Sequence, residues 1–224
     1  MPSKATPCEL EALYRGRFGG GAAYRQAVWR VLISDFFGAY VGGAQAVLDL
    51  GCGYGEFINQ VSAPARYAMD LNPDAARHLD PRVRLLEQDC SSRWALEDES
   101  LDLVFTSNFF EHLPDKASLA RTLAEIRRCL KPGGRLVAMG PNIRLVPGRY
   151  WDFWDHYLPL TERSLAEGLG AAGFCLERLV GRFLPYTMSG GGHYPLVLLR
   201  LYLRLPVLWR VFGRQFLVVA AKAK

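Results

Sequence analysis

The chain has 224 residues and a mass of 25.1 kDa, with 50% hydrophobic and 22% charged residues. These values are typical of a globular protein and exclude collagen-like, coiled-coil and intrinsically disordered chains. The net charge of +5 is concentrated at one end, because residues 177–224 hold eight Lys and Arg residues against one acid, whereas residues 1–176 hold 19 bases and 21 acids. The basic C-terminal segment therefore needs an explanation of its own.

The spacing of the cysteines and the hydropathy of the chain indicate the cellular compartment. The five cysteines are widely spread and form no CxxC pair, which favours reduced thiols and no structural zinc. The longest segment without a formal charge, residues 183–199, contains three glycines and two prolines and does not resemble a membrane-spanning helix. The first twenty residues lack the apolar core of a signal peptide. We expect a cytoplasmic protein, with peripheral contact at the inner face of the membrane left open.

Glycine and proline residues divide the chain into short apolar runs and longer segments of helical period, which is typical of an α/β fold with a mainly parallel sheet. A first helix is expected over about residues 24–40. A helix begins after Asp115, a good N-cap, and ends at Lys131, and another begins at Thr161 and ends near Gly173. The predicted strands span residues 46–50, 65–69, 83–87, 101–106, 135–139, 175–183 and 215–221.

The connection between the last two strands, residues 184–213, is long for a sheet and forms an insert. Pro206 is expected to divide it into two short helices that carry two arginine pairs, each four residues apart. Leucine, valine and aromatic residues around the arginines give more apolar surface than a solvent-facing helix usually has. The protein's own core, a second copy of the chain or an anionic membrane would each cover this surface, and the sequence leaves the three open.

The strongest motif follows the first strand, where Asp49 precedes three alternating glycines, Gly51, Gly53 and Gly55, ahead of an expected helix. Glycines let the backbone approach a ligand closely, and the helix start would offer unpaired amides. A dinucleotide fingerprint would place a third glycine where this chain has Glu56. A carboxylate there repels pyrophosphate but suits an ammonium or sulfonium cation, which opposes a dehydrogenase.

Acidic residues follow the next two strands at related positions. Asp70 ends the second strand about twenty residues beyond the glycines, where a carboxylate can accept both hydroxyls of a ribose. Asp89 follows the third strand, although taken alone it is more typical of a turn cap. After the fourth strand comes the segment Glu111-His112-Leu113, and Lys131-Pro132-Gly133-Gly134 precedes the fifth.

With these motifs, residues 46–174 resemble the class I S-adenosylmethionine-dependent methyltransferases, particularly members that modify quinones, sugars and other small molecules. The resemblance implies a doubly wound, Rossmann-like sheet of seven strands whose last strand is antiparallel, and S-adenosylmethionine as the cofactor. The cofactor-binding residues that it implies are Asp49, Gly51, Cys52, Gly53, Asp70, Leu71, Asp89, Cys90 and Asn108.

Methyl transfer needs alignment of the nucleophile with the methyl group and requires no metal, but a hydroxyl acceptor must lose a proton to a base. His112, just beyond the fourth strand, is the first candidate, although a structural histidine bonded to backbone is equally consistent with its position. His156, paired with Asp155, is the second. It lies in the aromatic segment 150–157, a candidate substrate wall in which Trp151 and Trp154 are alternatively core residues.

These inferences predict one methyltransferase domain over residues 1–224. It divides into an N-terminal helical cover (1–44) whose segment 14–18 closes over the cofactor, a cofactor-binding core (45–183), the basic apolar insert (184–213) and the last strand (214–224). The expected reaction is methyl transfer to a small-molecule or lipid-linked acceptor, such as a sugar, quinone or glycolipid intermediate. The alternative is a non-catalytic adenosylmethionine-binding or membrane-associated partner protein. Residues 194–214 are the expected membrane contact, and no nucleic acid is expected as a partner.

Overall fold

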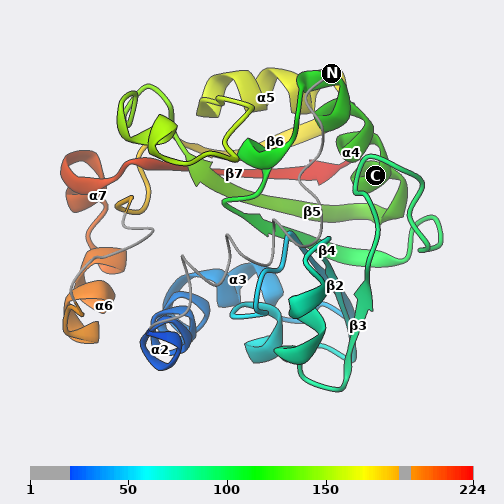
Figure 1. The fold of residues 1–224 in the computed structure, drawn as a ribbon, viewed down its shortest axis with the longest axis horizontal. Helices are drawn as coiled ribbons and strands as arrows, with labels where there is room; N and C mark the ends of the chain where they lie inside the picture. The colour runs from blue at the N-terminus through cyan, green and yellow to red at the C-terminus, as the bar shows by residue number, and fades with distance from the viewer. Residues whose placement is uncertain (1–20, 187–192, 224) are drawn as a thin grey trace.

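A mixed sheet of seven strands organises the computed structural model, which describes residues 21–186 and 193–223 (Figure 1). The strand order is β3-β2-β1-β4-β5-β7-β6; β1 to β5 are parallel, and β7 lies antiparallel between β5 and β6. The strands are β1 (Ala46–Leu50), β2 (Ala65–Met69), β3 (Val83–Leu86), β4 (Leu101–Ser107), β5 (Leu130–Pro141), β6 (Phe174–Val180) and β7 (Gln215–Lys222). The predicted fold class is thus confirmed. The predicted segment 14–18 lies outside the described residues.

Helices cover both faces of the sheet (Figure 1). On one face, α4 (Lys116–Cys129) and α5 (Glu162–Ala171) pack their apolar sides on the strands. The other face carries α2 (Ala22–Leu32), the π-helical turn η1 (Ile33–Phe37), α3 (Gly38–Val41), α6 (Leu196–Arg204) and α7 (Pro206–Phe212). The N-terminal helices and the insert before the last strand therefore share one face, where α2 and α6 contact each other.

Capping residues set the starts of α4 and α5 as predicted. The Asp115 carboxylate accepts the Ser118 amide at 2.7 Å, and Thr161 and Ser164 form a reciprocal capping box. Strand β5 begins earlier than expected, because Leu130 pairs with Leu101 directly after α4, ahead of an irregularity in the pairing. Strand β6 ends at Val180 rather than at residue 183.

The prediction of a helix after the glycine loop is wrong. The segment between β1 and β2 contains only one 3₁₀ turn, η2 (Ile58–Gln60), after which Val61 is already extended. Residues 51–64 must form the glycine loop and return the chain to the start of β2, which leaves room for a single turn. The backbone amides of the loop are engaged within the protein: Gly51 and Cys52 donate to the Met69 carbonyl, and Gly53 donates to Asp70.

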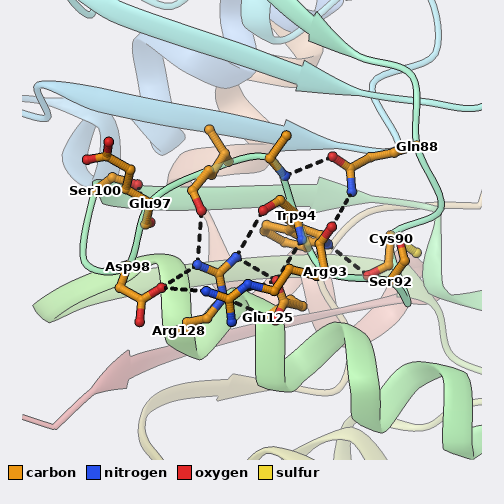
Figure 2. A network of polar contacts seen from close by, with 12 residues as sticks. Gln88, Cys90, Ser92, Arg93, Trp94, Glu97, Asp98, Ser100, Glu125 and Arg128 are labelled. Atoms are coloured by element: carbon orange, nitrogen blue, oxygen red, sulfur yellow. Dashed lines mark hydrogen bonds and ion pairs between the residues drawn. The ribbon is translucent and has the colours of Figure 1, made fainter.

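An ion network, largely buried at Arg128 and Glu125 but exposed at Asp98, fixes the loop between β3 and β4 against α4 (Figure 2). The Arg128 guanidinium pairs with Glu125 and Asp98, both at 2.6 Å, and donates to the Leu96 carbonyl at 2.9 Å. Glu125 in turn accepts the Trp94 amide at 2.8 Å. Because these side chains form charge-assisted hydrogen bonds with one another, the network anchors the segment that includes the predicted site residues Asp89 and Cys90.

The insert folds as two short helices separated at Pro206, as predicted. Its inner side belongs to the protein's own core: the Tyr202 hydroxyl donates to the Phe183 carbonyl, and the Trp209 indole donates to the Tyr202 carbonyl at 2.8 Å. Its outer side remains exposed. Within the described ranges, no helix has both the length and the apolar character that crossing a bilayer requires.

Candidate cofactor and acceptor site

The glycine loop after β1 adopts a backbone that side chains disfavour. Gly51, Gly53 and Gly55 have φ of +72°, +53° and +74°, in the left-handed region that glycine enters without strain. A Cβ atom on Gly51 would lie 2.3 Å from the ring of Phe109, in the loop after β4. The motif glycines therefore allow the loops after β1 and β4 to pack closely together.

Asp70 joins the end of β2 to the glycine loop. Its carboxylate accepts the Gly53 amide at 2.8 Å and the Asn72 amide at 2.9 Å. Burial raises the pKa of Asp70, whereas these amides and a charge on His112 act to lower it. Leu71, the next residue, exposes 46% of its surface beside this acid. The structure thus brings together three of the predicted positions, Gly53, Asp70 and Leu71.

A second buried acid, Asp49, lies beneath the loop. Burial raises its pKa well above the ordinary value, and the negative charges of Glu56 and Asp70 raise it further. Glu56 forms an ion pair with Arg25 of α2 at 3.0 Å, which ties the N-terminal helix to the loop. The Cys52 thiol is also buried, and burial followed by the same acids raises its pKa. Three acids within electrostatic reach of one another favour a positively charged ligand.

Asp89 and Cys90 occupy a tight turn after β3. The Asp89 carboxylate accepts both the amide and the hydroxyl of Ser91 at 2.9 Å, which is the turn-capping arrangement. The Cys90 carbonyl accepts the Trp94 indole at 2.8 Å, and its thiol accepts the Thr122 hydroxyl at 3.4 Å. The turn-cap alternative for Asp89 is thus realised, and a role toward a ligand stays a prediction.

Two asparagines near the loop carry polar atoms that are buried without a hydrogen-bond partner among the described residues: Asn72 Nδ2 and Asn108 Oδ1. Asn108 also has an unfavourable φ of +51°, and its backbone N–H donates to the Met139 carbonyl at 2.8 Å. A strained residue with an unsatisfied carbonyl is a common sign of a ligand site. Together with the Asp70 carboxylate, these atoms suit a ligand with ribose hydroxyls and an amino group.

His112 and Asp155 meet on the other side of the site. The His112 Nδ1 atom lies 2.9 Å from the Asp155 carbonyl oxygen and 3.2 Å from its carboxylate. Both partners accept hydrogen bonds, so Nδ1 carries the proton and Nε2 is left as the basic nitrogen. Burial disfavours the imidazolium, but the Asp155 hydrogen bond and the Glu111 charge outweigh it and raise the pKa of His112. The sequence instead paired Asp155 with His156; the structure adds the contact of Asp155 with His112, and the pairing with His156 stays a prediction.

Glu111 is the residue that the sequence reasoning missed. Its side chain is 4% exposed, its Oε1 atom has no hydrogen-bond partner among the described residues, and burial raises its pKa to about 7. One carboxylate oxygen of Glu111 and one nitrogen each of His112 and His156 lie within 4.8 Å of one another. The sequence signal was present, because Glu111 directly precedes His112.

The aromatic segment after β5 forms a wall beside these residues. The His156 ring stacks on Phe153 with centroids 4.8 Å apart, and the buried Tyr150 ring lies 4.7 Å from it. Trp151 and Trp154 are not core residues, since they are 59% and 84% exposed. The alternative of core packing is therefore wrong for both tryptophans.

Comparison with known proteins assigns the central part of the chain to a family. Residues 48–138, which include the glycine loop, Asp70, Asp89 and His112, match the family described as a methyltransferase domain. Over these residues the chain is similar to that domain. S-adenosylmethionine is the cofactor of this family, as the resemblance implied.

Relatives and solved structures agree with the methyltransferase domain. A probable S-adenosylmethionine-dependent methyltransferase of Mycobacterium tuberculosis is 34% identical over 147 residues, which cover 62% of this chain and 52% of the relative. A 2-methyl-6-phytyl-1,4-hydroquinone methyltransferase of Synechocystis sp. is 28% identical over 147 residues, covering 57% and 45%. The crystal structure of a SAM-dependent methyltransferase from Archaeoglobus fulgidus shares the fold, with a TM-score of 0.67 and 21% identity over 94% of this chain and 99% of that one. The chain spans about half the length of the two curated relatives.

Because Glu111 is buried, we expect the stability of the folded protein to depend on pH. Its folded pKa of about 7 lies above the ordinary 4.5, so the folded state holds the proton more tightly and the carboxylate becomes destabilising as the pH rises between these values. His112, Asp155 and Tyr150 face the same carboxyl group. We expect Glu111→Gln to unfold at the same denaturant concentration as the wild type near pH 4.5, and to be more stable by about 3 kcal/mol above pH 7.5. Urea titrations across this range measure the difference, and a difference that does not vary with pH would contradict the assignment.

Proposed function

We propose that this chain is an enzyme that transfers the methyl group of S-adenosylmethionine to a hydroxyl group of a small-molecule acceptor. The observation that supports it most directly is the His112–Asp155 pair, whose basic nitrogen lies within electrostatic reach of Asp70 and hence of the glycine loop. A cofactor cradle next to an oriented base is the arrangement that methylation of a hydroxyl requires.

In this proposal the residues of the first four strand ends hold the cofactor. Asp70 would accept the ribose hydroxyls, Leu71 would pack on the adenine, and Asp89 with the Cys90 amide would contact the adenine edge. The glycine loop (Asp49, Gly51, Cys52 and Gly53) and Asn108 surround the methionine part, where the buried acids favour its positive charge. When bound, the cofactor supplies an electrophilic methyl group for in-line displacement.

His112 removes the acceptor proton in this scheme. Its Nε2 atom would take the proton of the acceptor hydroxyl while the methyl group passes from sulfur to oxygen and S-adenosylhomocysteine leaves, and Asp155 would stabilise the imidazolium that forms. The proton leaves to solvent after the product departs, since 22% of the His112 side chain is exposed. His156, with Phe153 and Tyr150, lines the acceptor side of the reaction.

The acceptor that we propose is a lipid-linked molecule: a quinol, a sugar or a glycolipid intermediate. Support for a quinol comes from the relative that acts, by its name, on a phytylated hydroquinone. Support for a lipid-borne acceptor comes from the exposed apolar side chains of the basic insert, since residues 194–214 are the peripheral membrane contact that we propose. We take residues 1–224 as one functional unit, with the helical cover and the insert on the same face of the sheet.

Calorimetric titration with S-adenosylhomocysteine, the demethylated product, tests the cofactor site without any acceptor. Micromolar binding is expected, and Asp70→Ala should weaken it by about 1–3 kcal/mol through the lost ribose hydrogen bonds. Turnover is then measured with labelled methyl donor on hydroquinones and on lipid-linked sugars. Binding of S-adenosylhomocysteine without turnover on any of these acceptors would favour the alternative, a non-catalytic adenosylmethionine-binding partner protein.

A further inference from the structure

The outer side of the insert is an apolar surface without a covering in the described structure. Helices α6 and α7 turn one side onto the core and leave large apolar side chains at 50–67% exposure on the other. The most exposed of these are Val197, Leu198, Leu201, Val207, Val211 and Phe212. Exposed large apolar side chains gathered on two adjacent helices are typical of a binding surface.

Positive charge accompanies this patch. Arg204 and Arg210 are exposed on the same two helices, and the chain contains no Asp or Glu after Glu177. Arg200, in contrast, is neutralised by Asp35 of the η1 turn at 2.8 Å. The free charges therefore lie on the outer side of the insert, among the exposed apolar residues.

The loop that carries Trp151 and Trp154 starts next to the end of the insert. It begins at Asn142, whose backbone amide donates to the carbonyl of Arg214, two residues after α7. In Figure 1 the yellow-green loop and the orange-red α7 lie at the same end of the sheet, the end to which β5 points. The two tryptophans of this loop are 59% and 84% exposed, and the Trp151 ring contacts Tyr150, which in turn contacts His156.

We infer that the outer side of α6 and α7 and the 151–157 loop together dock onto the surface of an anionic phospholipid bilayer. Apolar side chains flanked by arginines and exposed tryptophans are the composition that inserts into the headgroup region. A second copy of the chain fits less well, because a symmetric contact would bring Arg204 and Arg210 of both copies together with no acid of the insert to neutralise them. This inference deepens the proposed function, since a lipid-linked acceptor would reach His112 from the docked side.

Co-sedimentation with vesicles tests the docking. The wild type is expected to bind vesicles of phosphatidylcholine with 30% phosphatidylglycerol, and to bind phosphatidylcholine alone much more weakly. Neutralising both exposed arginines, Arg204→Gln with Arg210→Gln, should weaken binding to the anionic vesicles roughly 30-fold. Leu201→Asp should also reduce binding, because it places a charge where an apolar side chain enters the lipid.

Leu176→Asp is the matched control. Leu176 on β6 is 45% exposed, similar to Leu201 at 50%, but belongs to neither helix of the insert. Its substitution should leave vesicle binding unchanged. In parallel, brominated lipids should quench the tryptophan fluorescence of the wild type, and less so that of Trp151→Phe with Trp154→Phe.

The outcomes separate docking from catalysis. Titration of each variant with S-adenosylhomocysteine without vesicles reports on the cofactor site alone, so a failure of the proposed function would appear there and not in the sedimentation. Equal binding to neutral and anionic vesicles, or no binding to either, would overturn the inference. So would a dimer in sedimentation equilibrium that Leu201→Asp dissociates, because a second copy would then cover the surface.

Discussion

Replacing Gly51 by valine is expected to abolish the binding of S-adenosylhomocysteine, with a loss of at least about 100-fold in affinity. Gly51 has a φ of +72°, and a Cβ atom there would collide with the Phe109 ring at 2.3 Å. A side chain here would block the close approach of the backbone to the ligand, and it would also force Phe109 to move, and with it the adjacent Asn108. Calorimetric titration measures the affinity.

Gly43 provides the matched control for Gly51. Its φ of +84° is equally unfavourable for a side chain, but nothing lies within 4 Å of the position a Cβ would take. Gly43→Val should therefore carry the backbone strain without the collision and retain binding. If Gly51→Val binds S-adenosylhomocysteine as tightly as Gly43→Val does, the placement of the cofactor beside this loop is incorrect.

The second large effect is expected at His112. With an acceptor hydroxyl, His112→Ala should lower kcat by about 10²- to 10⁴-fold while leaving S-adenosylhomocysteine affinity nearly unchanged. Asp155→Asn retains the base but removes the charge that raises the pKa of His112, so the imidazole loses its proton at lower pH. The rising limb of the kcat–pH profile should therefore move to lower pH, with a reduced maximum.

The pH profile distinguishes a positioning role for Asp155 from a merely structural one. A structural defect would lower kcat at all pH values without moving the limb. An NMR titration of the His112 imidazole in the wild type and in Asp155→Asn gives the same comparison without an acceptor. An unchanged His112 pKa would contradict the assigned pair, and full activity of His112→Ala would indicate an acceptor that needs no base.

Local patterns predicted the elements of this fold well. The starts of α4 and α5 follow from Asp115 and Thr161, whose caps involve residues only three positions away. Strands β1 and β2 have the predicted bounds because short apolar runs end at turn residues. The prediction of a helix after the glycine loop was wrong. A glycine motif alone does not reveal how soon β2 begins, and the chain is already extended at Val61.

The site was harder to predict where its contacts join distant residues. The pairs Arg25–Glu56 and His112–Asp155 span 31 and 43 positions, and no spacing rule connects them. Sequence reasoning assigned Asp155 to its neighbour His156 and did not predict its contact with His112, 43 positions away. The burial of Glu111 depends equally on the segment 150–158 that folds over it, since its carbonyl accepts the Tyr157 and Leu158 amides.

The central place of β7 has a consequence for how the protein is made. Strands β5 and β6 leave the ribosome before β7, although β7 is the strand that pairs with both of them. Until residues 215–222 are synthesised, two open strand edges and the apolar sides of α6 and α7 are exposed together, which favours aggregation. A fragment that stops at Pro141, the end of β5, would likewise keep its β5 edge unpaired.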